Sequence, residues 1–297
     1  MNRLLTVTDR KTDPLRDYER EMRTAHFSPV TITDRLELLR RLAAFLDGTP
    51  LLDASGEQLR AFQAQFAHLA PATMDIYTRH VRALYKWAHK RHLIAENPAD
   101  ELVIPRVPKA RPHPTSLEDL RLVFAVTRGP LRVAYTLAAF AGLRRGEICR
   151  LHRRDLSLAQ REPTALIHGK GRKERIVPLV SPVVTEIEAA HSNGWIVNLD
   201  GKPYPPEKLS VDSSLYLRGL GVRTTLHSMR GTFATLVARI THDPMFVRDL
   251  LGHESVSTTE IYVQSSLNGA HDRLRGLTDQ ASDVLNLGGR PRRLRSV

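Results

Sequence analysis

The sequence predicts a mainly α-helical protein of the α+β class, with one small β-hairpin and two domains. The chain has 297 residues, which is enough for two domains of about 100–200 residues each. Hydrophobic residues make up 41% of it, as expected for packed cores, and many recur at the helical period. Four prolines between residues 105 and 114 interrupt that pattern and mark the best domain boundary.

The block before this boundary reads as helical. Residues 1–28 are polar and highly charged, and we expect them to form a partly ordered N-terminal extension. In the predicted domain 29–104, Thr33 is expected to cap a first helix whose apolar stripe runs from Leu36 to Leu46. A second helix is expected over about 56–68 and a third over about 71–92, with Asn97-Pro98 ending the block.

The third of these helices places cations on one face. They recur at spacings of three, four and four, which puts them on the same side: Arg79, Arg82, Lys86 and Lys90. Apolar residues should largely occupy the opposite side: Ile76, Val81, Leu84, Trp87 and Ala88. An ordinary solvated face is one interpretation. The formal net charge of +12 favours phosphate contact instead.

The proline-rich linker, 105–114, carries three interleaved cations: Arg106, Lys109 and Arg111. They suggest that the linker follows a phosphate backbone, although a merely soluble spacer would look similar.

The second predicted domain, 115–280, opens with a helix that starts near Ser116. One helix, interrupted or bent around Gly142, is expected over 131–152, and Cys149 in it is expected to pack. Short strands over 165–168 and 175–180 should flank a glycine-rich turn. Further helices are expected over 182–190, 206–219, 227–240, 244–251 and 256–262.

Composition limits the classes of function. A net charge of +12 indicates a polyanionic partner such as nucleic acid, or an acidic membrane surface. No run of about 18 apolar residues predicts a membrane span, and no apolar signal core predicts secretion. A single cysteine fits a reducing cytoplasm, where a DNA-bound form would join the nucleoid. We expect no metal, since neither zinc-type Cys/His spacing nor a compelling acidic cluster is present.

Several residues have the chemistry that phosphodiester cleavage needs. Arginine binds phosphate oxygens bidentately, which makes Arg144 a candidate, and Gly142 permits a close approach beside it. Glu147, one helical turn on, would orient Arg144, unless the two form only a surface ion pair. Lys170 lies in a glycine-bracketed basic turn and could transfer a proton, although such turns are commonly just solvated.

Four more candidates follow. His227 and Arg230 are three residues apart at a predicted helix start, so both can face one pocket. His253 comes twenty-three residues after Arg230, and Tyr262 nine after that. A phenol, with a reference pKa of about 10, becomes a useful nucleophile only when cations stabilise its target and a base takes its proton. All six in one ordered series make coincidence a poor explanation.

The segments AGLRRGEI, GKGRKERIVPL, HSMRGTFAT and LGHESVSTTEIYV resemble the signature boxes of tyrosine recombinases, the phage integrase/Xer family. The resemblance covers most of 115–265, and the helical block before it resembles the family's core-site-binding domain. It implies a C-terminal catalytic domain and a C-shaped clamp of both domains on DNA. One departure is Gly231, where many members have histidine; that position is not a phosphate ligand in the family scheme.

The resemblance also implies a mechanism without cofactors. Two arginines would clamp the scissile phosphate, one histidine would add a hydrogen bond, and a second would help to deprotonate the tyrosine nucleophile. A lysine would protonate the departing 5′-hydroxyl, leaving a 3′-phosphotyrosyl bond that needs no ATP to be rejoined. By the resemblance, the arginines of the clamp would be Arg144 and Arg230, and Glu147 would be their supporting acid. His253 would give the hydrogen bond and His227 would help the deprotonation. Tyr262 would be the nucleophile and Lys170 the proton donor.

The implied partners are double-stranded DNA, a homotetramer on two duplexes, and accessory DNA-bending or directionality factors. Downstream of Tyr262, an apolar stripe could dock on a neighbouring protomer or pack against its own domain: Leu274, Leu277, Ala281 and Val284. Residues 281–297 are expected to form a basic tail that ends in several arginines: Arg290, Arg292, Arg293 and Arg295.

Three alternatives stay open. The chain could be an Xer-type resolvase of chromosome or plasmid dimers rather than an integrase of a phage or mobile element. About 30 residues precede the first predicted helix, too few for a full arm-site-binding domain, so we expect a short integrase or an Xer-like protein. The sequence around Gly231 favours the integrase. A DNA-binding regulator that has lost catalysis and a type IB topoisomerase are the other readings, and the six candidate residues and the wording of the boxes argue against them.

Overall fold

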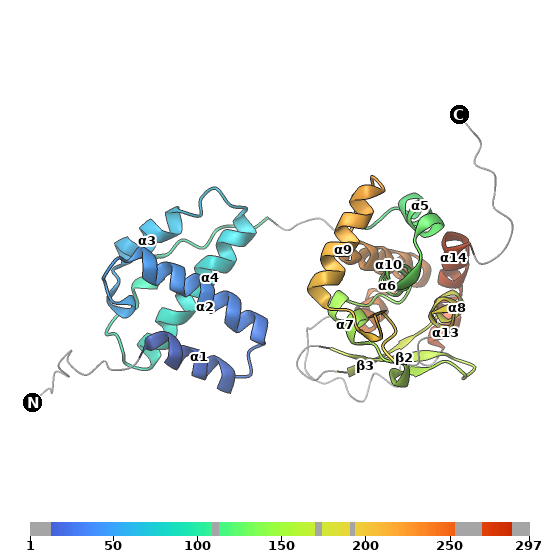
Figure 1. Cartoon of the computed structure of the whole chain (residues 1–297), viewed down its shortest axis with the longest axis horizontal. Helices are drawn as coiled ribbons and strands as arrows, with labels where there is room; N and C mark the ends of the chain where they lie inside the picture. Colours follow the sequence, from blue (N-terminus) through green and yellow to red (C-terminus); the bar gives the residue numbers. More distant parts are fainter. Residues whose placement is uncertain (1–12, 109–112, 170–173, 191–193, 253–268, 287–297) are drawn as a thin grey trace, which may run out of the picture. The chain divides into compact units, whose positions relative to one another are not determined.

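The computed structural model describes residues 13–108, 113–169, 174–190, 194–252 and 269–286. The chain divides into two compact units, Met1–Ala110 and Arg111–Val297. Helices dominate both units, and the only sheets of the described residues lie in the second, which confirms the predicted mainly α-helical class with a small β element (Figure 1).

The first unit is a helical bundle. Its helices are α1 (Pro14–Thr24), α2 (Pro29–Phe45), α3 (Gly56–Ala64) and α4 (Pro71–Lys90). One 3₁₀ turn, Leu51–Asp53, lies between α2 and α3, and another, Pro98–Glu101, follows α4. In Figure 1, α2 and α4 lie side by side in this unit. The core takes side chains from all four helices: Tyr18, Met22, Leu39, Leu42, Leu59, Phe62, Leu84 and Tyr85.

The start of this unit differs from the prediction. No helix was predicted within residues 1–28, but α1 lies there. It forms because Asp13 caps it, Pro14 fits its first turn, and Tyr18 and Met22 are buried one turn apart. Helix α2 begins at Pro29 rather than beyond Thr33, since the Ser28 hydroxyl accepts the Thr31 N–H at 3.1 Å. Helix α3 ends at Ala64, earlier than expected.

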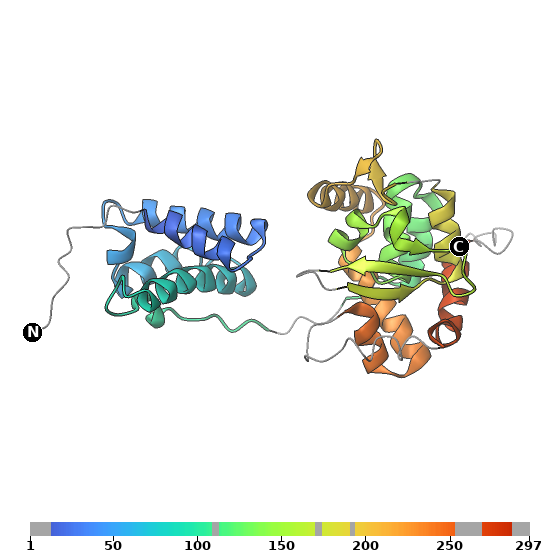
Figure 2. The ribbon, with the colours of Figure 1, turned by 90° about the horizontal axis from the view of Figure 1, so that it is seen from below.

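The second unit contains nine described helices: α5 (Leu117–Val126), α6 (Gly129–Phe140), α7 (Arg145–Arg150), α8 (Ser181–Ala189), α9 (Pro206–Gly219), α10 (Leu226–Thr241), α11 (Pro244–Leu251), α13 (Ala270–Arg273) and α14 (Arg275–Leu285). A 3₁₀ turn spans Arg153–Asp155. The antiparallel sheet has the order β1 (Leu156–Ser157), β2 (Thr164–His168), β3 (Glu174–Pro178), and His168 pairs with Glu174 at the hairpin end. A second hairpin, whose strands β4 (Asn198–Leu199) and β5 (Lys202–Pro203) have two residues each, was not predicted. Figure 2 shows β2 and β3 running along one side of the unit's helices.

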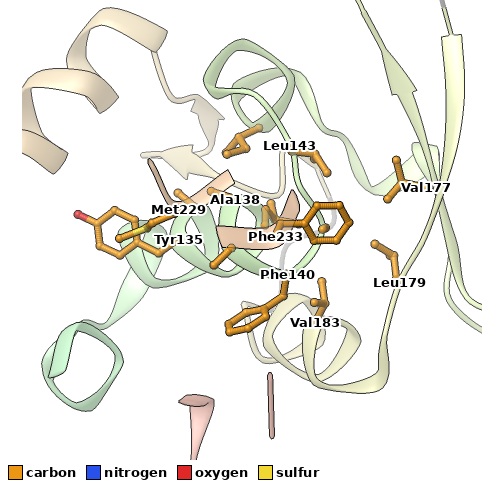
Figure 3. Close-up of a cluster of buried hydrophobic side chains, with 14 of the residues drawn as sticks. Tyr135, Ala138, Phe140, Leu143, Val177, Leu179, Val183, Met229 and Phe233 are labelled. Carbon is orange, nitrogen blue, oxygen red and sulfur yellow. The ribbon is translucent and has the colours of Figure 1, made fainter. Parts of the chain in front are cut away.

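The core of this unit is built around α6, whose residues 133–140 are all buried. Phe233 of α10 packs in the middle of the cluster in Figure 3, near Leu143 and Phe140. Helix α6 ends before Gly142, which has a φ of +65°. An alanine Cβ at Gly142 would lie 2.4 Å from a Phe233 ring carbon. Only glycine fits here, and the turn divides the predicted 131–152 helix into α6 and α7.

Helix α14 packs against its own unit, where it contacts α5, α8 and α10. The predicted apolar stripe, which starts at the N-cap residue of α14, is buried: Leu274, Leu277, Ala281 and Val284. Arg132 donates to the Leu285 carbonyl at 3.1 Å, and Arg121 pairs with Asp283 at 2.6 Å. Of the two interpretations of this stripe, packing within its own domain is correct, and the helix continues to Leu285, into the residues expected to form a tail.

Replacing Leu277 by alanine is expected to lower the free energy of unfolding by about 2–5 kcal/mol, because it leaves a cavity at a fully buried position. The matched control is Asp279→Ala at an exposed position of the same helix, which should change stability by less than about 0.5 kcal/mol. Urea unfolding of both variants checks this, and equal stabilities would show that α14 does not pack as described.

Among the described residues, no helix combines the length and the apolar character that crossing a bilayer requires.

Candidate active site

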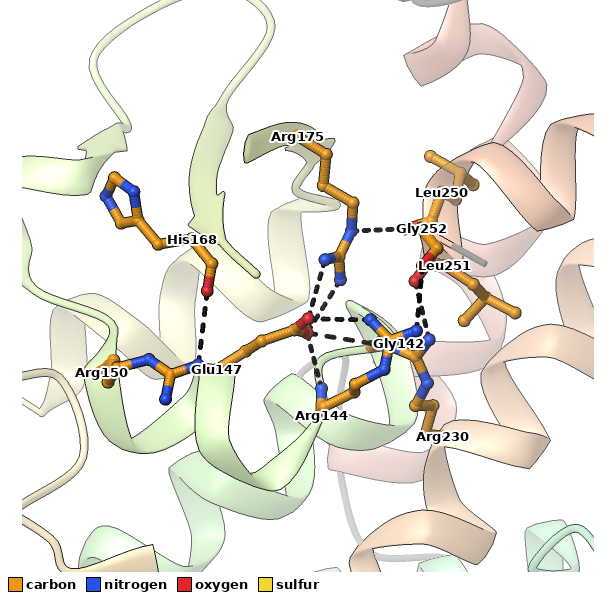
Figure 4. A network of polar contacts seen from close by, with 10 residues as sticks. All are labelled: Gly142, Arg144, Glu147, Arg150, His168, Arg175, Arg230, Leu250, Leu251 and Gly252. Carbon is orange, nitrogen blue, oxygen red and sulfur yellow. Dashed lines mark hydrogen bonds and ion pairs between the residues drawn. The ribbon is translucent and has the colours of Figure 1, made fainter. Parts of the chain in front are cut away.

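Glu147 is the centre of a buried polar network (Figure 4). Its side chain is 2% exposed. It accepts the backbone N–H of Arg144 at 2.8 Å and the Arg144 Nη1 at 2.9 Å. Both guanidinium Nη atoms of Arg175 donate to it at 2.9 Å, and Nη1 of Arg230 lies 3.9 Å away. One carboxylate thus organises three arginines from three separate segments.

Local geometry fixes the first of these partners. Arg144 is the N-cap of α7 and Glu147 is its third residue, so the carboxylate reaches back to the free N–H at the helix start, as in a capping box. The turn at Gly142 aims this helix start towards α10, since the Gly142 carbonyl accepts a hydrogen bond from Arg230 Nη1. The expected orientation of Arg144 by Glu147 is therefore present, but in a buried cluster rather than a surface pair.

Arg175 was not among the residues singled out from the sequence. It lies on β3 opposite Ile167, which is buried, and two residues before Val177, which is also buried. The period of two in a strand therefore places Arg175 on the inward side. An arginine at an inward strand position was the signal that could have identified it, because such a charge needs a buried partner.

Three consecutive carbonyls at the end of α11 each accept a hydrogen bond from a different arginine. Leu250 accepts from Arg175 Nε at 3.0 Å, and Leu251 accepts from Arg230 Nη2 at 2.7 Å. Gly252 accepts from Arg144 Nη2 at 3.0 Å. The last carbonyls of a helix have no partner within it and carry partial negative charge, so they suit guanidinium groups.

Gly252 makes this close approach possible. Its φ of +60° ends α11, and an alanine Cβ there would lie 3.0 Å from the Arg175 Cδ. The next residue along the chain is His253, so the chain leaves the arginine cluster directly into the segment that carries two predicted site residues.

The network carries excess positive charge. Three arginines and one carboxylate give formal charges of +3 and −1, hence +2 in total. Burial by itself raises the Glu147 pKa, but hydrogen bonds from Arg175 and Arg144 outweigh it and lower that pKa to about 2. Burial, with the neighbouring charges of Arg144 and Arg175, lowers the Arg230 pKa to about 10, against the opposing effect of Glu147. A site with this excess of positive charge is suited to an anion.

Replacing Glu147 by glutamine is expected to lower the free energy of unfolding at pH 7 by about 3–5 kcal/mol, because it leaves buried guanidinium charges unpaired. The Glu147 pKa of about 2 is below the ordinary 4.5, so its stabilisation is complete above pH 4.5 and is lost as pH falls towards 2. The acid side of the stability–pH curve should therefore flatten in the variant.

Denaturant unfolding between pH 2 and 7 measures both effects. Glu188→Gln, an exposed position of the same unit, is the matched control and should leave the curve unchanged. A Glu147→Gln variant as stable as that control would contradict the role of the carboxylate.

The structure describes the predicted site residues in part. His227 is exposed in the first turn of α10, whereas Arg230, three residues later on the same helix, is 5% exposed and held by Gly142 and Leu251. Lys170, His253 and Tyr262 lie outside the described residues, as do Lys109 and Arg111 of the linker. The hairpin strands on either side of Lys170 are described, and β3 is anchored to Glu147 through Arg175.

The cations predicted to bind DNA in the first unit lie at or near its surface. Arg79 pairs with Asp75 at 2.8 Å, and Arg82 donates to the Leu102 carbonyl at 3.3 Å. Lys86, Lys90 and Arg106 are exposed. The expected apolar side of α4 needs one correction: Ile76 is 51% exposed, because it lies one turn before Arg79 on the solvent side, whereas Leu84 is fully buried.

Within the described ranges, no group of three or more His, Cys, Asp or Glu side chains is arranged to hold a metal ion.

Comparison with known proteins identifies the family. The model of the phage integrase family matches residues 119–268, about half of the chain. Tyrosine recombinase XerA of Thermococcus onnurineus (strain NA1) is 30% identical over 178 residues, which cover 56% of this chain and 63% of that protein, less than two thirds of its length. Tyrosine recombinase XerC of Shewanella sp. (strain W3-18-1) is 28% identical over 290 residues, or 89% of this chain and 93% of that protein.

The solved structures show the same fold. A lambda integrase dimer bound to a COC′ core site matches with a TM-score of 0.70 and 16% sequence identity, covering 84% of this chain and 98% of that one. The family match includes every candidate catalytic residue from Arg144 to Tyr262. The chain therefore belongs to the phage integrase family, whose members among its relatives are tyrosine recombinases.

Proposed function

We propose that the protein is a site-specific DNA recombinase that cuts and rejoins DNA through a 3′-phosphotyrosyl intermediate. The observation that carries this proposal is the arginine cluster. Arg144 and Arg230 come from separate helices, share Glu147, and are held by the adjacent carbonyls of Gly252 and Leu251. Two guanidinium groups fixed close together, with excess positive charge around them, are suited to the non-bridging oxygens of one phosphate.

In the proposed reaction Tyr262 attacks phosphorus while Arg144 and Arg230 stabilise the charge on the phosphoryl oxygens. His253 would add a hydrogen bond to the phosphate, and His227 would help to remove the phenol proton. Lys170 would protonate the departing 5′-hydroxyl. The partial exposure of Arg144, 43% of its side chain, supports a role in contact with DNA.

The phosphotyrosyl bond would retain the free energy of the phosphodiester, so a 5′-hydroxyl from a partner strand could attack it and release Tyr262. Fixed guanidinium groups would stabilise the developing charge in both steps without reorganising, which is an efficient form of electrostatic catalysis.

We further propose that double-stranded DNA is bound by both units, through the cations of α4 and the linker as well as the catalytic domain. Lambda integrase has been solved as a tetramer bound to a Holliday junction, with a TM-score of 0.69 to this chain. As part of this proposal, the protein acts as a homotetramer at synapsis and is located at the nucleoid in the cytoplasm. Accessory DNA-bending factors would act with the tetramer.

The direct test is covalent trapping. The full chain is incubated with a pool of nicked duplexes that tile the DNA around its own coding sequence, and the mixture is denatured. We expect a covalent adduct in which the DNA 3′-phosphate is attached to Tyr262, next to a free 5′-hydroxyl end. DNA binding without an adduct would support a non-catalytic regulator, and attachment through a 5′-phosphate would overturn the mechanism.

Integration or excision of a phage or mobile element is the biological role we propose, with Xer-type dimer resolution as the second candidate. The sequence around Gly231 favours the integrase role. The match to an Xer recombinase, over 93% of that protein's length, favours dimer resolution. The trapped site separates the two roles. Recombination between a pair of different attachment sites supports integration, whereas recombination between two copies of one chromosomal site supports dimer resolution.

A further inference from the structure

We propose that Arg175 is a positioning residue whose positive charge offsets the negative charge of Glu147, so that the charges of Arg144 and Arg230 remain available for the scissile phosphate. The inference rests on the proposed function and deepens it, because it assigns a third arginine, one that is almost fully buried, to the site.

The contacts of Arg175 all point into the protein. Its side chain is 10% exposed, and three of its donor atoms bind protein acceptors: Nε to the Leu250 carbonyl and both Nη atoms to Glu147. This bidentate pairing is the strongest form of arginine–carboxylate contact. Arg144, by comparison, gives Glu147 a single side-chain hydrogen bond and is 43% exposed. Arg175 therefore occupies the carboxylate, while Arg144 faces outward.

The charge count explains why a third arginine would be needed. With only Arg144 and Arg230, Glu147 would leave the cluster a formal charge of +1; with Arg175 the charge is +2. A phosphodiester carries one negative charge, and the pentacoordinate transition state formed by phenolate attack carries two. A site of +2 therefore stabilises the transition state more than the ground state, which is the condition for a faster reaction.

The electrostatics of Arg230 support this argument. Burial is the main reason that its pKa falls to about 10, and the charges of Arg144 and Arg175 lower that pKa further. Arg175 thus raises the positive potential at Arg230. The two side chains lie close together, since Arg175 donates to the Leu250 carbonyl and Arg230 to the adjacent Leu251 carbonyl.

A purely structural role for Arg175 is the competing explanation, since it joins β3 to α7 and α11. The two explanations differ in how the effect depends on the charge of the substrate. A methylphosphonate at the scissile position replaces one charged oxygen by a methyl group and removes one negative charge from the transition state. If Arg175 acts through its charge, its loss should matter less on this substrate.

The experiment compares the rates of adduct formation on nicked duplexes that carry either a phosphodiester or a methylphosphonate at the trapped site. Arg175→Met should slow cleavage of the phosphodiester by about 10–100-fold, less than the loss of an arginine that touches the phosphate. On the methylphosphonate it should lose less than about threefold relative to the unsubstituted protein, because a charge lost from both partners costs little. Arg175→Lys, which keeps the charge but not the planar fork, should stay within about fivefold on both substrates.

Arg275→Met is the matched control, since Arg275 is exposed on α14 and outside the network, and it should not change either rate. Equal losses on the two substrates for Arg175→Met, or no loss at all, would overturn the inference. If that variant does not fold, Arg175→Lys decides: a large and equal loss on both substrates would show that the fork geometry matters and the charge does not. Absence of an adduct from the unsubstituted protein would instead refute the proposed function itself.

Discussion

Replacing Tyr262 by phenylalanine should abolish covalent attachment to DNA while leaving DNA affinity within about threefold of that of the unsubstituted protein. The phenolic oxygen is the only atom removed, and no phosphotyrosyl bond can form without it. Affinity should persist, because most of it comes from cations that contact phosphates along the duplex. Denaturing gels of reactions on a nicked duplex measure the adduct, and gel-shift titration at a fixed salt concentration measures the affinity.

The matched control is Tyr216→Phe, a half-buried tyrosine of α9 in the same unit, which should form the adduct at the normal rate. An adduct that persists in the Tyr262→Phe variant would mean that another side chain is the nucleophile. Loss of the adduct in both variants would point to a general defect in the catalytic unit and would not support Tyr262.

Replacing Arg230 by alanine should reduce the rate of DNA cleavage by about 10³-fold, because the site loses a fixed cation that would face the developing negative charge. The fold should survive the change. Glu147 keeps its hydrogen bonds to Arg144 and Arg175 at 2.9 Å, whereas Arg230 lies 3.9 Å from it. Loss of its hydrogen bonds to the Gly142 and Leu251 carbonyls should lower the free energy of unfolding by about 1–3 kcal/mol, which leaves the protein folded, and DNA affinity should change little.

Single-turnover cleavage of the nicked duplex tests this prediction, with denaturant unfolding of the same samples to separate stability from catalysis. Arg239→Ala is the matched control, because Arg239 is exposed on the same helix, α10. A variant of Arg230 that cleaves within about tenfold of the unsubstituted rate would remove this residue from the proposed phosphate clamp.

The sequence was informative where contacts are local. Glu147 lies three residues after Arg144, and a helix brings side chains at that spacing together whatever the rest of the chain does. The interruption at Gly142 was also predictable, since a glycine can adopt a positive φ where other residues cannot. The helix face of α14 followed from its apolar period, although the period does not show which surface it covers.

Polar composition misled the prediction at the N-terminus. Helix α1 buries only Tyr18 and Met22, so its apolar signal is short, and Asp13-Pro14 was the better indicator of a helix start. A short amphipathic helix gains its stability from packing on its neighbours, here mainly α2, and not from its own composition.

By itself, the sequence determined which residue types occur in which order, the helical class, and the resemblance that the family match confirms. Only the tertiary structure decided that Arg175 shares Glu147, across 28 residues, and that three arginines bind consecutive carbonyls at the end of α11, across up to 108 residues. The physical reason is that helix and strand periods fix only neighbours within a few residues. Contacts between distant segments depend on how buried surfaces pack, and a buried charge takes whichever partner that packing brings close.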